Sequence, residues 1–485
     1  MRKFLTFVIA MCITDSLLAG GLVTNTNQSA LYTRLQSRNA STDIDAVYYN
    51  PAGLTKLGDG FYVSLNNQTI SQTQTIGSDY PFLSGTLPKE YVGNVSAPIY
   101  PGVYLAYKTG KFAFSGGFNV IGGGGGAKYD TGLPSFEMPI SSLVPVLSAT
   151  LAPLDEAFLA ATGNDPGFRN ITGYAADIFF EGTSVYFGYQ ANVSYEINDM
   201  ISAAIGGRFV SAKNTYKGYI RNVNIDAPAS YGGSQAPGDY LRTIAGIPGV
   251  PAGTAALLNG TAAYIDDATN IEADVEMKGT GFTPILSLNI APSEKLNIAV
   301  RYEFKTKLDL TTTVNDGKDA NGMFTQDSVA KADMPAQLSV GIDLKPIDNL
   351  LLSGSFNYYF DKNVDYDGQE NVDINMIDKN FIEFGLGAEY GIGEKLRVSA
   401  GWVHTISGVN SNYQNDRNNE TNANSFGGGF GYRITPMIDL NIGGQYTMYA
   451  EYSKDFGIEP LTWIETYNKN TWLIAVGLDF HFGGK

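Results

Sequence analysis

The residue types that most often carry catalysis are sparse in this chain of 485 residues. It contains two histidines, His404 and His481, and one cysteine, Cys12. A serine or cysteine hydrolase needs a nucleophile beside a positioned histidine, and no such set stands out along the sequence. We therefore expect that the protein is not an enzyme.

Metal chemistry has little support in the sequence. The segment Asn363-Val-Asp365-Tyr-Asp367-Gly368 matches the first half of a calcium loop, but Ile374 occupies the position of the bidentate glutamate. We interpret the segment as a solvated acidic loop, with binding of divalent ions as the alternative. Neither a metal site nor a cofactor is expected.

Five consecutive glycines raise the question of phosphate binding; they are Gly122, Gly123, Gly124, Gly125 and Gly126. A phosphate-binding loop leads into a helix, whereas this run continues through Ala127-Lys128-Tyr129. The preceding Phe112, Phe114 and Phe118 alternate as the outer face of a strand would. Because glycine weakens strand pairing and tolerates bulges, we interpret the run as the irregular end of a strand.

Period-2 alternation dominates the chain from Gly60 onward, which is typical of strands with one apolar face. In the segment 382–390, Ile382, Phe384 and Leu386 share one face, while Glu383 and Gly385 share the other. The pattern predicts fourteen strands, near residues 60–74, 97–108, 111–124, 181–196, 201–220, 271–291, 296–313, 329–345, 350–362, 379–392, 396–409, 424–435, 438–454 and 470–483.

The connections between these strands alternate between tight turns and long loops, the largest being 125–180 and 221–270. Such asymmetry is typical of outer-membrane barrels, because in lipid every backbone group must be paired and a closed sheet achieves this. The sequence therefore predicts an all-β fold, a transmembrane antiparallel β-barrel of about 14 strands with a polar lumen. An exported all-β sandwich is the alternative, although its inner faces would be more apolar.

Composition and the N-terminus agree with export to a membrane. Charged residues make up 16% of the chain and aromatic residues 12%, and the formal net charge of −16 argues against a nucleic-acid partner. Residues 1–19 combine a basic start, an apolar stretch and small residues, which predicts a signal peptide. Since Cys12 lies within it, the mature chain would have no cysteine.

The segment 20–59, between the signal peptide and the first strand, carries the most specific motif. Its residues Ala46-Val-Tyr-Tyr-Asn50-Pro51-Ala52-Gly-Leu54 resemble the FadL family of outer-membrane transporters, in which an Asn-Pro-Ala motif lies in an N-terminal plug called the hatch. The resemblance implies a hatch at 20–59 inside the lumen and a barrel at 60–485. Independently of the family, Pro51 restricts its own backbone angle φ and the backbone conformation of the preceding Asn50, which favours a rigid bend.

The resemblance also implies a function: passive uptake of a hydrophobic small molecule, similar to a long-chain fatty acid or an aromatic hydrocarbon. Such a ligand would be captured by extracellular loops, pass to a site against the hatch, and leave through the barrel wall. The implied partners are the ligand, outer-membrane lipid and lipopolysaccharide, and the barrel-assembly machinery. An outer-membrane surface binding or adhesion barrel is the alternative, and a lipid-hydrolysing barrel a third.

Three sets of residues are candidates for this function. An apolar patch in the loop 125–180 is a candidate capture site, or else a self-packed cap on the barrel; its members are Leu147, Leu151, Leu154 and Phe158. The inward-facing cations Arg208, Arg301 and Lys305 are candidates for a carboxylate ligand, or else balance charge within the lumen. The run Gly122–Gly126 is a candidate lateral opening, because the third strand kinks in the FadL family, or else a loose strand-to-loop junction.

Overall fold

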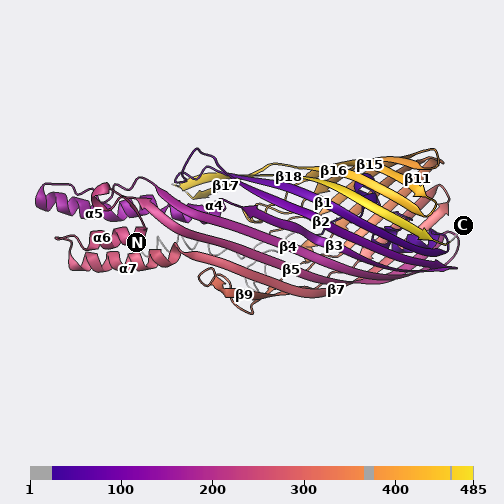
Figure 1. The fold of residues 1–485 in the computed structure, drawn as a ribbon, viewed down its shortest axis with the longest axis horizontal. Coiled ribbons are helices and arrows are strands. Elements are labelled where there is room, and N and C mark those ends of the chain that lie inside the picture. Colours follow the sequence, from indigo (N-terminus) through magenta and orange to yellow (C-terminus); the bar gives the residue numbers. More distant parts are fainter. Residues whose placement is uncertain (1–23, 365–375, 459–460, 484–485) are drawn as a thin grey trace.

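A computed structural model describes residues 24–364, 376–458 and 461–483 of the chain (Figure 1). The expected signal peptide lies outside these residues, as do Asp365, Asp367 and Ile374 of the acidic loop. The described chain forms a long antiparallel barrel with helices at one end (Figure 1).

The barrel is a single closed sheet, because β1 pairs on one side with β2 and on the other with β18. Its strands are β1 (Gly60–Ser78), β2 (Lys89–Thr109), β3 (Phe112–Tyr129), β4 (Tyr174–Glu196), β5 (Ile201–Asp226), β7 (Ile271–Ser293), β8 (Leu296–Glu303), β9 (Asp309–Asp319), β10 (Val329–Lys331), β11 (Gln337–Ile347), β12 (Leu350–Tyr359), β13 (Ile382–Ile392), β14 (Leu396–Ile406), β15 (Ala423–Thr435), β16 (Ile438–Tyr449), β17 (Tyr452–Ile458) and β18 (Leu461–Phe482). The pairs β8 and β9, β10 and β11, and β16 and β17 are each one interrupted wall strand, and the short β6 (Ser234–Gln235) pairs only with β5. Within the described residues the wall therefore has fourteen strands, which confirms the predicted fold class.

The two faces of the wall differ as the alternation predicted. In β13, Phe384 is 42% exposed and Leu386 58% exposed, whereas Glu383 between them is 7% exposed. Apolar side chains thus face outward and polar ones inward, which is the arrangement that lipid outside and a polar lumen inside require.

Several strands extend far beyond the length that crosses a bilayer, and the longest are β4, β5 and β7. The strands β4, β5 and β7 have 23, 26 and 23 residues, whereas about 9–11 residues span the membrane. Their outer ends carry a helical cap of α4 (Pro134–Ser141), α5 (Leu143–Thr162), η2 (Ala229–Tyr231), α6 (Pro237–Ala245) and α7 (Ala252–Ala268), to the left in Figure 1. The helical segment Pro134–Thr162 is by length and composition apolar enough to span a membrane, but here it packs in this cap.

The N-terminal segment forms a hatch built of short helices, α2 (Ala30–Arg34), α3 (Ala46–Tyr49) and η1 (Pro51–Lys56). The helix α2 packs against β14, β15, β16 and β18, while η1 packs against β3, β4, β5 and β7 on the other side of the lumen. Tyr48 and Tyr49 are each 2% exposed. The hatch therefore fills the lumen from wall to wall.

Candidate functional site: the hatch, the wall break and the cavity

The Asn-Pro-Ala motif joins the hatch to the barrel wall. The side-chain nitrogen Nδ2 of Asn50 donates to the Ser41 carbonyl at 3.0 Å and to the side-chain oxygen of Asn289 in β7 at 2.7 Å. The Pro51 carbonyl accepts from the Ser194 hydroxyl of β4 at 2.7 Å. Pro51 is the first residue of η1, a position where its missing N–H has no helical partner to lose. The bend thus directs η1 against β4 and β7.

A charge network holds the hatch together internally. The Arg38 guanidinium donates to both carboxylate oxygens of Asp45, at 2.9 and 2.7 Å, and to Asp43 at 2.7 Å. Asp43 lies inside the barrel with half of its side chain accessible, so the loss of bulk solvent around it would raise its pKa, but the neighbouring Arg38 outweighs this effect and holds that pKa well below its usual range. The hatch is therefore a preformed plug with satisfied charges rather than a loose tail.

The three candidate lumen cations have partners within the structure. Arg208 makes two hydrogen bonds to the Glu303 carboxylate, at 2.6 and 2.9 Å, and Lys305 pairs with Asp333 at 2.8 Å. The guanidinium carbons of Arg208 and Arg301 lie 4.8 and 4.9 Å from the ring centre of Tyr48. None of the three lines the large cavity described below. Arg208 and Arg301 thus lie against the hatch, where both guanidinium groups contact the ring of Tyr48.

The glycine run is a double irregularity in β3. Its pairing with β4 shifts register twice, between Val120 and Gly122 and between Gly123 and Gly125. Gly123 has φ of +68° and Gly125 has φ of +139°, angles that residues with a side chain rarely adopt. A Cβ at Gly123 would lie 2.1 Å from the Ser184 carbonyl oxygen. Only glycine fits this bend without displacing β4.

Opposite the glycine run, the hydrogen-bonded ladder between β2 and β3 is interrupted. Pairing stops at Val95 with Ala127 and resumes at Gly102 with Asn119. The stretch of β2 that does not pair with β3, residues 96–101, contains Pro98 and Pro101, which have no backbone N–H to donate. Bulges in one strand and prolines in the other thus coincide at one break in the wall. Sequence reasoning found the glycines but missed the prolines, whose spacing within a predicted strand was the available signal.

The hatch covers this break from inside and takes over the hydrogen bonds that β2 does not make. The Asn25 N–H donates to the Ile121 carbonyl at 2.9 Å, and its side-chain nitrogen donates to the Gly123 carbonyl. The Val120 carbonyl accepts from the side-chain nitrogen Nε2 of Gln28 at 3.0 Å. Thr24 forms an antiparallel bridge with Gly122. The N-terminal strand-like segment of the hatch therefore satisfies backbone groups that would otherwise be exposed in the wall.

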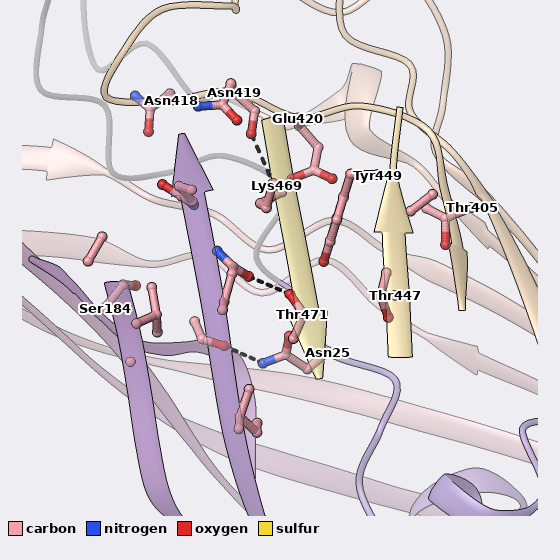
Figure 2. A pocket seen from close by; sticks show the side chains of 18 of the residues that line it. Asn25, Ser184, Thr405, Asn418, Asn419, Glu420, Thr447, Tyr449, Lys469 and Thr471 are labelled. Carbon is pink, nitrogen blue, oxygen red and sulfur yellow. Dashed lines mark hydrogen bonds and ion pairs between the residues drawn. The ribbon is translucent and has the colours of Figure 1, made fainter. Parts of the chain in front are cut away.

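A cavity of about 490 Å³ lies directly above this segment. Its floor is formed by Thr24–Asn27 and Tyr32, and its side reaches the wall break at Val95 and Gly125. Figure 2 shows Asn25 at the opposite side of the cavity from Asn418, Asn419 and Glu420. The volume is ordinary for a small-molecule site. By contrast, the space between hatch and wall lower down, beside Tyr48, is about 10 Å³.

The roof of the cavity is the connection between β14 and β15, residues 407–422, which folds into the lumen. Gln414 is 3% exposed and Asp416 is 4% exposed. Lys469 of β18 donates to the Glu420 carboxylate at 3.1 Å, and Asp416 accepts from the Ser135 N–H of α4 at 2.7 Å. This roof was not predicted, because an Asn-rich stretch with few apolar residues resembles an ordinary solvated loop.

The candidate capture residues lie in the core of the helical cap and not in the cavity lining. Leu147 and Leu151 are each 1% exposed and Leu154 is 8% exposed. These three residues form one apolar cluster with residues of α6 and α7, and Phe158 packs against that cluster. In this arrangement they hold the cap together. Their direct contact with ligand stays a prediction, which would require the cap to separate.

The remaining chemistry-bearing residues have local partners. The His404 ring nitrogen lies 3.0 Å from the Asn424 side chain, and the His481 ring nitrogen lies 3.2 Å from Asp439. Among the residues that the structure describes, no group of three His, Cys, Asp or Glu side chains is arranged to hold a metal ion.

Comparison with known proteins defines the class of fold. The sequence matches no protein-family model and no curated protein. In structure it is similar to a FadL homologue from Pseudomonas aeruginosa, with a TM-score of 0.62 and 14% identity over 95% of this chain and 100% of the other. It is also similar to the Pseudomonas putida toluene transporter TodX, with a TM-score of 0.53 and 11% identity over 93% of this chain and 97% of the other. The chain therefore has the fold of the FadL-type outer-membrane barrels, fourteen strands closed around an N-terminal plug.

Proposed function

We propose that this protein is an outer-membrane channel of the FadL type for passive uptake of small hydrophobic molecules. The observation that carries the proposal is the break in pairing between β2 and β3, because Val95 and Gly125 at its edge also line the cavity. Solved structures with this fold include a toluene transporter. Outer-membrane lipid, lipopolysaccharide and the assembly machinery remain expected partners.

The route follows from how the lumen is blocked. Below the cavity the hatch packs against the wall on both sides, so a solute cannot continue straight through the barrel. The break is covered by residues 24–28, which bind it through Asn25 and Gln28 and make further hydrogen bonds to Gln68 and Tyr49. Moving this uncharged segment breaks hydrogen bonds, whereas moving the whole hatch also breaks its buried ion pairs, so the smaller movement costs less. Sideways release is therefore the easier path.

Outside the break the surface suits an apolar solute. Ile99, in the stretch of β2 that does not pair with β3, is 74% exposed. Val95 and Gly125 line the cavity on the inner side of the same stretch. A hydrophobic molecule leaving the cavity would pass from apolar side chains to lipid without entering water, and the transfer of its apolar surface favours that direction.

A reversible covalent bond across the break tests the route. A Cβ built on Gly125 would lie 3.7 Å from the Ala97 Cβ, within the range of a disulfide, which is about 3.5–4.5 Å. We expect the variant Ala97→Cys/Gly125→Cys to lose most of its ethylbenzene uptake when oxidised and to regain it when reduced. Val95→Ala belongs in every arm, because the Val95 side chain would lie 2.7 Å from the new Cβ.

The measurement is uptake of radiolabelled ethylbenzene and oleate by cells that lack other channels for them. Cys12 is the sole cysteine of the chain and lies in the expected signal peptide, so no competing disulfide arises in the mature protein. The single variant Gly125→Cys controls for strain at Gly125, and the single variant Ala97→Cys controls for the change at Ala97. Equal uptake by the oxidised and reduced double variant would refute sideways release at this break.

A further inference from the structure

Tyr100 of β2 lies at the level of the wall break, and a bulge turns its side chain toward the lumen. On the side of β1, the two residues Pro98 and Ile99 lie opposite the single residue Thr69. One extra residue turns the side chains that follow it to the other face of the strand. Accordingly, Ile99 is 74% exposed, whereas Tyr100 is 4% exposed and lines the cavity. The bulge thus places a large aromatic side chain on the inner side of the break.

The side chain of Tyr100 spans the interval in which β2 and β3 do not pair. Its hydroxyl donates to the Val120 carbonyl of β3 at 2.5 Å. The ring is attached to β2 and reaches the backbone of β3, so it lies across the gap in the ladder. The hydroxyl therefore supplies a connection between the two strands that their backbones do not make there.

The same hydroxyl is also bound to the hatch. It accepts from the side-chain nitrogen Nδ2 of Asn25 at 2.7 Å, and that nitrogen donates to the Gly123 carbonyl as well. One hydroxyl and one amide thus connect β2, β3 and the N-terminal segment of the hatch. Tyr100, Asn25 and Gly123 all line the cavity, where Asn25 is visible in Figure 2. A solute in the cavity therefore meets this closure directly.

The two ends of Tyr100 are held in different ways. Its backbone N–H donates to the side-chain oxygen of Asn67 in β1 at 3.1 Å, and the nearby Pro98 carbonyl accepts from the Thr69 hydroxyl at 3.0 Å. These bonds fix the backbone to β1 whatever the ring does. Turning the ring into the adjoining cavity of about 490 Å³ breaks only the two hydrogen bonds of the hydroxyl, which is a modest cost.

We propose that Tyr100 is the gating residue of the lateral exit. Its ring closes the interval between β2 and β3, its hydroxyl holds the ring to Val120 and Asn25, and the loss of these hydrogen bonds sets the rate at which a solute passes into lipid. The ring offers an apolar solute a surface that demands no hydrogen bond. The proposal rests on the proposed function, since it names the residue that controls the same route.

The variant Tyr100→Phe tests the gate, because it keeps the ring and removes the hydroxyl. The Asn25 N–H, which donates to the Ile121 carbonyl, should exchange with deuterium about fivefold faster or more, since the lost hydrogen bonds favour local opening. Exchange is measured by mass spectrometry on the full mature chain in phosphatidylcholine nanodiscs. Uptake of radiolabelled ethylbenzene by cells should rise by a similar factor, because the rate of release follows the free energy of opening.

The matched control is Tyr104→Phe, on the same face of the same strand. The Tyr104 hydroxyl also binds the hatch, donating to the Gln28 carbonyl at 2.8 Å. Tyr104 lies opposite Gly117, however, where the ladder between β2 and β3 is intact. The Gln28 carbonyl also keeps a second donor, the Asn119 side chain at 3.2 Å. We expect Tyr104→Phe to leave both the exchange of the Asn25 N–H and the uptake of ethylbenzene unchanged.

The disulfide across the break shows whether the effect of Tyr100→Phe passes through the break. When Tyr100→Phe is added to the oxidised variant Val95→Ala/Ala97→Cys/Gly125→Cys, uptake should stay as low as before, because a covalent bond closes the wall. Reduction should restore uptake to the faster rate of Tyr100→Phe.

Three results would overturn the proposal: Asn25 exchange or ethylbenzene uptake that is unchanged in Tyr100→Phe, an equal rise in Tyr104→Phe, or a rise that persists in the oxidised disulfide variant. The second result would mean that the hydroxyls only anchor the hatch. Failure of the proposed function is recognised separately, because uptake by the disulfide variant that retains Tyr100 would then be equal in the oxidised and reduced forms.

Discussion

Two glycine runs in the same barrel have opposite effects on the wall. In β15, Gly427, Gly428 and Gly429 pair in unbroken register with both β14 and β16. In β3, the run Gly122–Gly126 coincides with two register shifts against β4 and with the loss of pairing to β2. A run of glycines is therefore not enough to open a β-sheet.

The difference lies in what each run faces. The hatch packs closely against the glycines of β15 and of its neighbour β16. A Cβ at Gly443 would lie 2.8 Å from the Arg34 backbone nitrogen, and a Cβ at Gly427 would lie 2.5 Å from the side-chain nitrogen of Gln36. The run in β3 faces a partner strand that carries Pro98 and Pro101. In β15 and β16 the missing side chains make room for the plug, whereas in β3 they permit backbone angles that break the ladder.

The largest effect should follow from filling the space on the hatch side. Gly443→Val places a side chain where the Arg34 and Thr33 backbone lies, so the hatch must move away from β16 while the strand ladder stays intact. We expect a severalfold rise in ion conductance in planar bilayers, since the lumen is no longer sealed.

The adjacent residue supplies the matched control for this prediction. A Cβ at Gly444 would meet only the Leu473 carbonyl oxygen, at 3.8 Å, on the other face of the same strand. Gly444→Val should therefore conduct as the unmodified protein does. If both variants leak equally, the damage lies in the barrel and the close approach of the hatch is not the reason for glycine at Gly443.

A smaller effect is expected on the stability of the barrel. Gly123→Ala puts a Cβ 2.1 Å from the Ser184 carbonyl at a φ of +68°, which should cost about 1–3 kcal/mol of unfolding free energy. Gly444→Ala, where the new Cβ makes only an ordinary contact of 3.8 Å, should change it by less than about 0.5 kcal/mol. Urea unfolding in lipid vesicles, followed by tryptophan fluorescence, measures both. Equal stabilities would mean that β3 relaxes at Gly123 and that its bend is not fixed by glycine.

The two glycine runs also show which features could be predicted from the sequence: those set by local alternation, and not those set by the pairing of distant strands. Strand number and the outward face followed from alternation, because burial on one face is a local property of each strand. The hatch was predicted from the residues around Asn50, but its contacts with Asn289 and Ser194 depend on register among distant strands. Likewise, Pro98 lies opposite the glycine run only after β2 and β3 are paired. The inward fold of residues 407–422 has no local signal at all, because polar residues occur equally in solvated loops and in wet lumens.

The smallest effect should come from the other side of the break. Pro98→Thr/Pro101→Thr restores two backbone N–H groups to β2 and introduces a residue that favours strands. The register shifts of β3 and the positive φ of Gly123 and Gly125 remain, so the restored donors still face a strand that is bent away from them. We expect less than about 0.5 kcal/mol of change in stability and ethylbenzene uptake within about twofold of the unmodified protein, a difference of roughly 0.4 kcal/mol. A loss of uptake comparable to that of the oxidised disulfide variant would reverse this assignment, because it would mean that the prolines keep the wall open and the glycines merely follow.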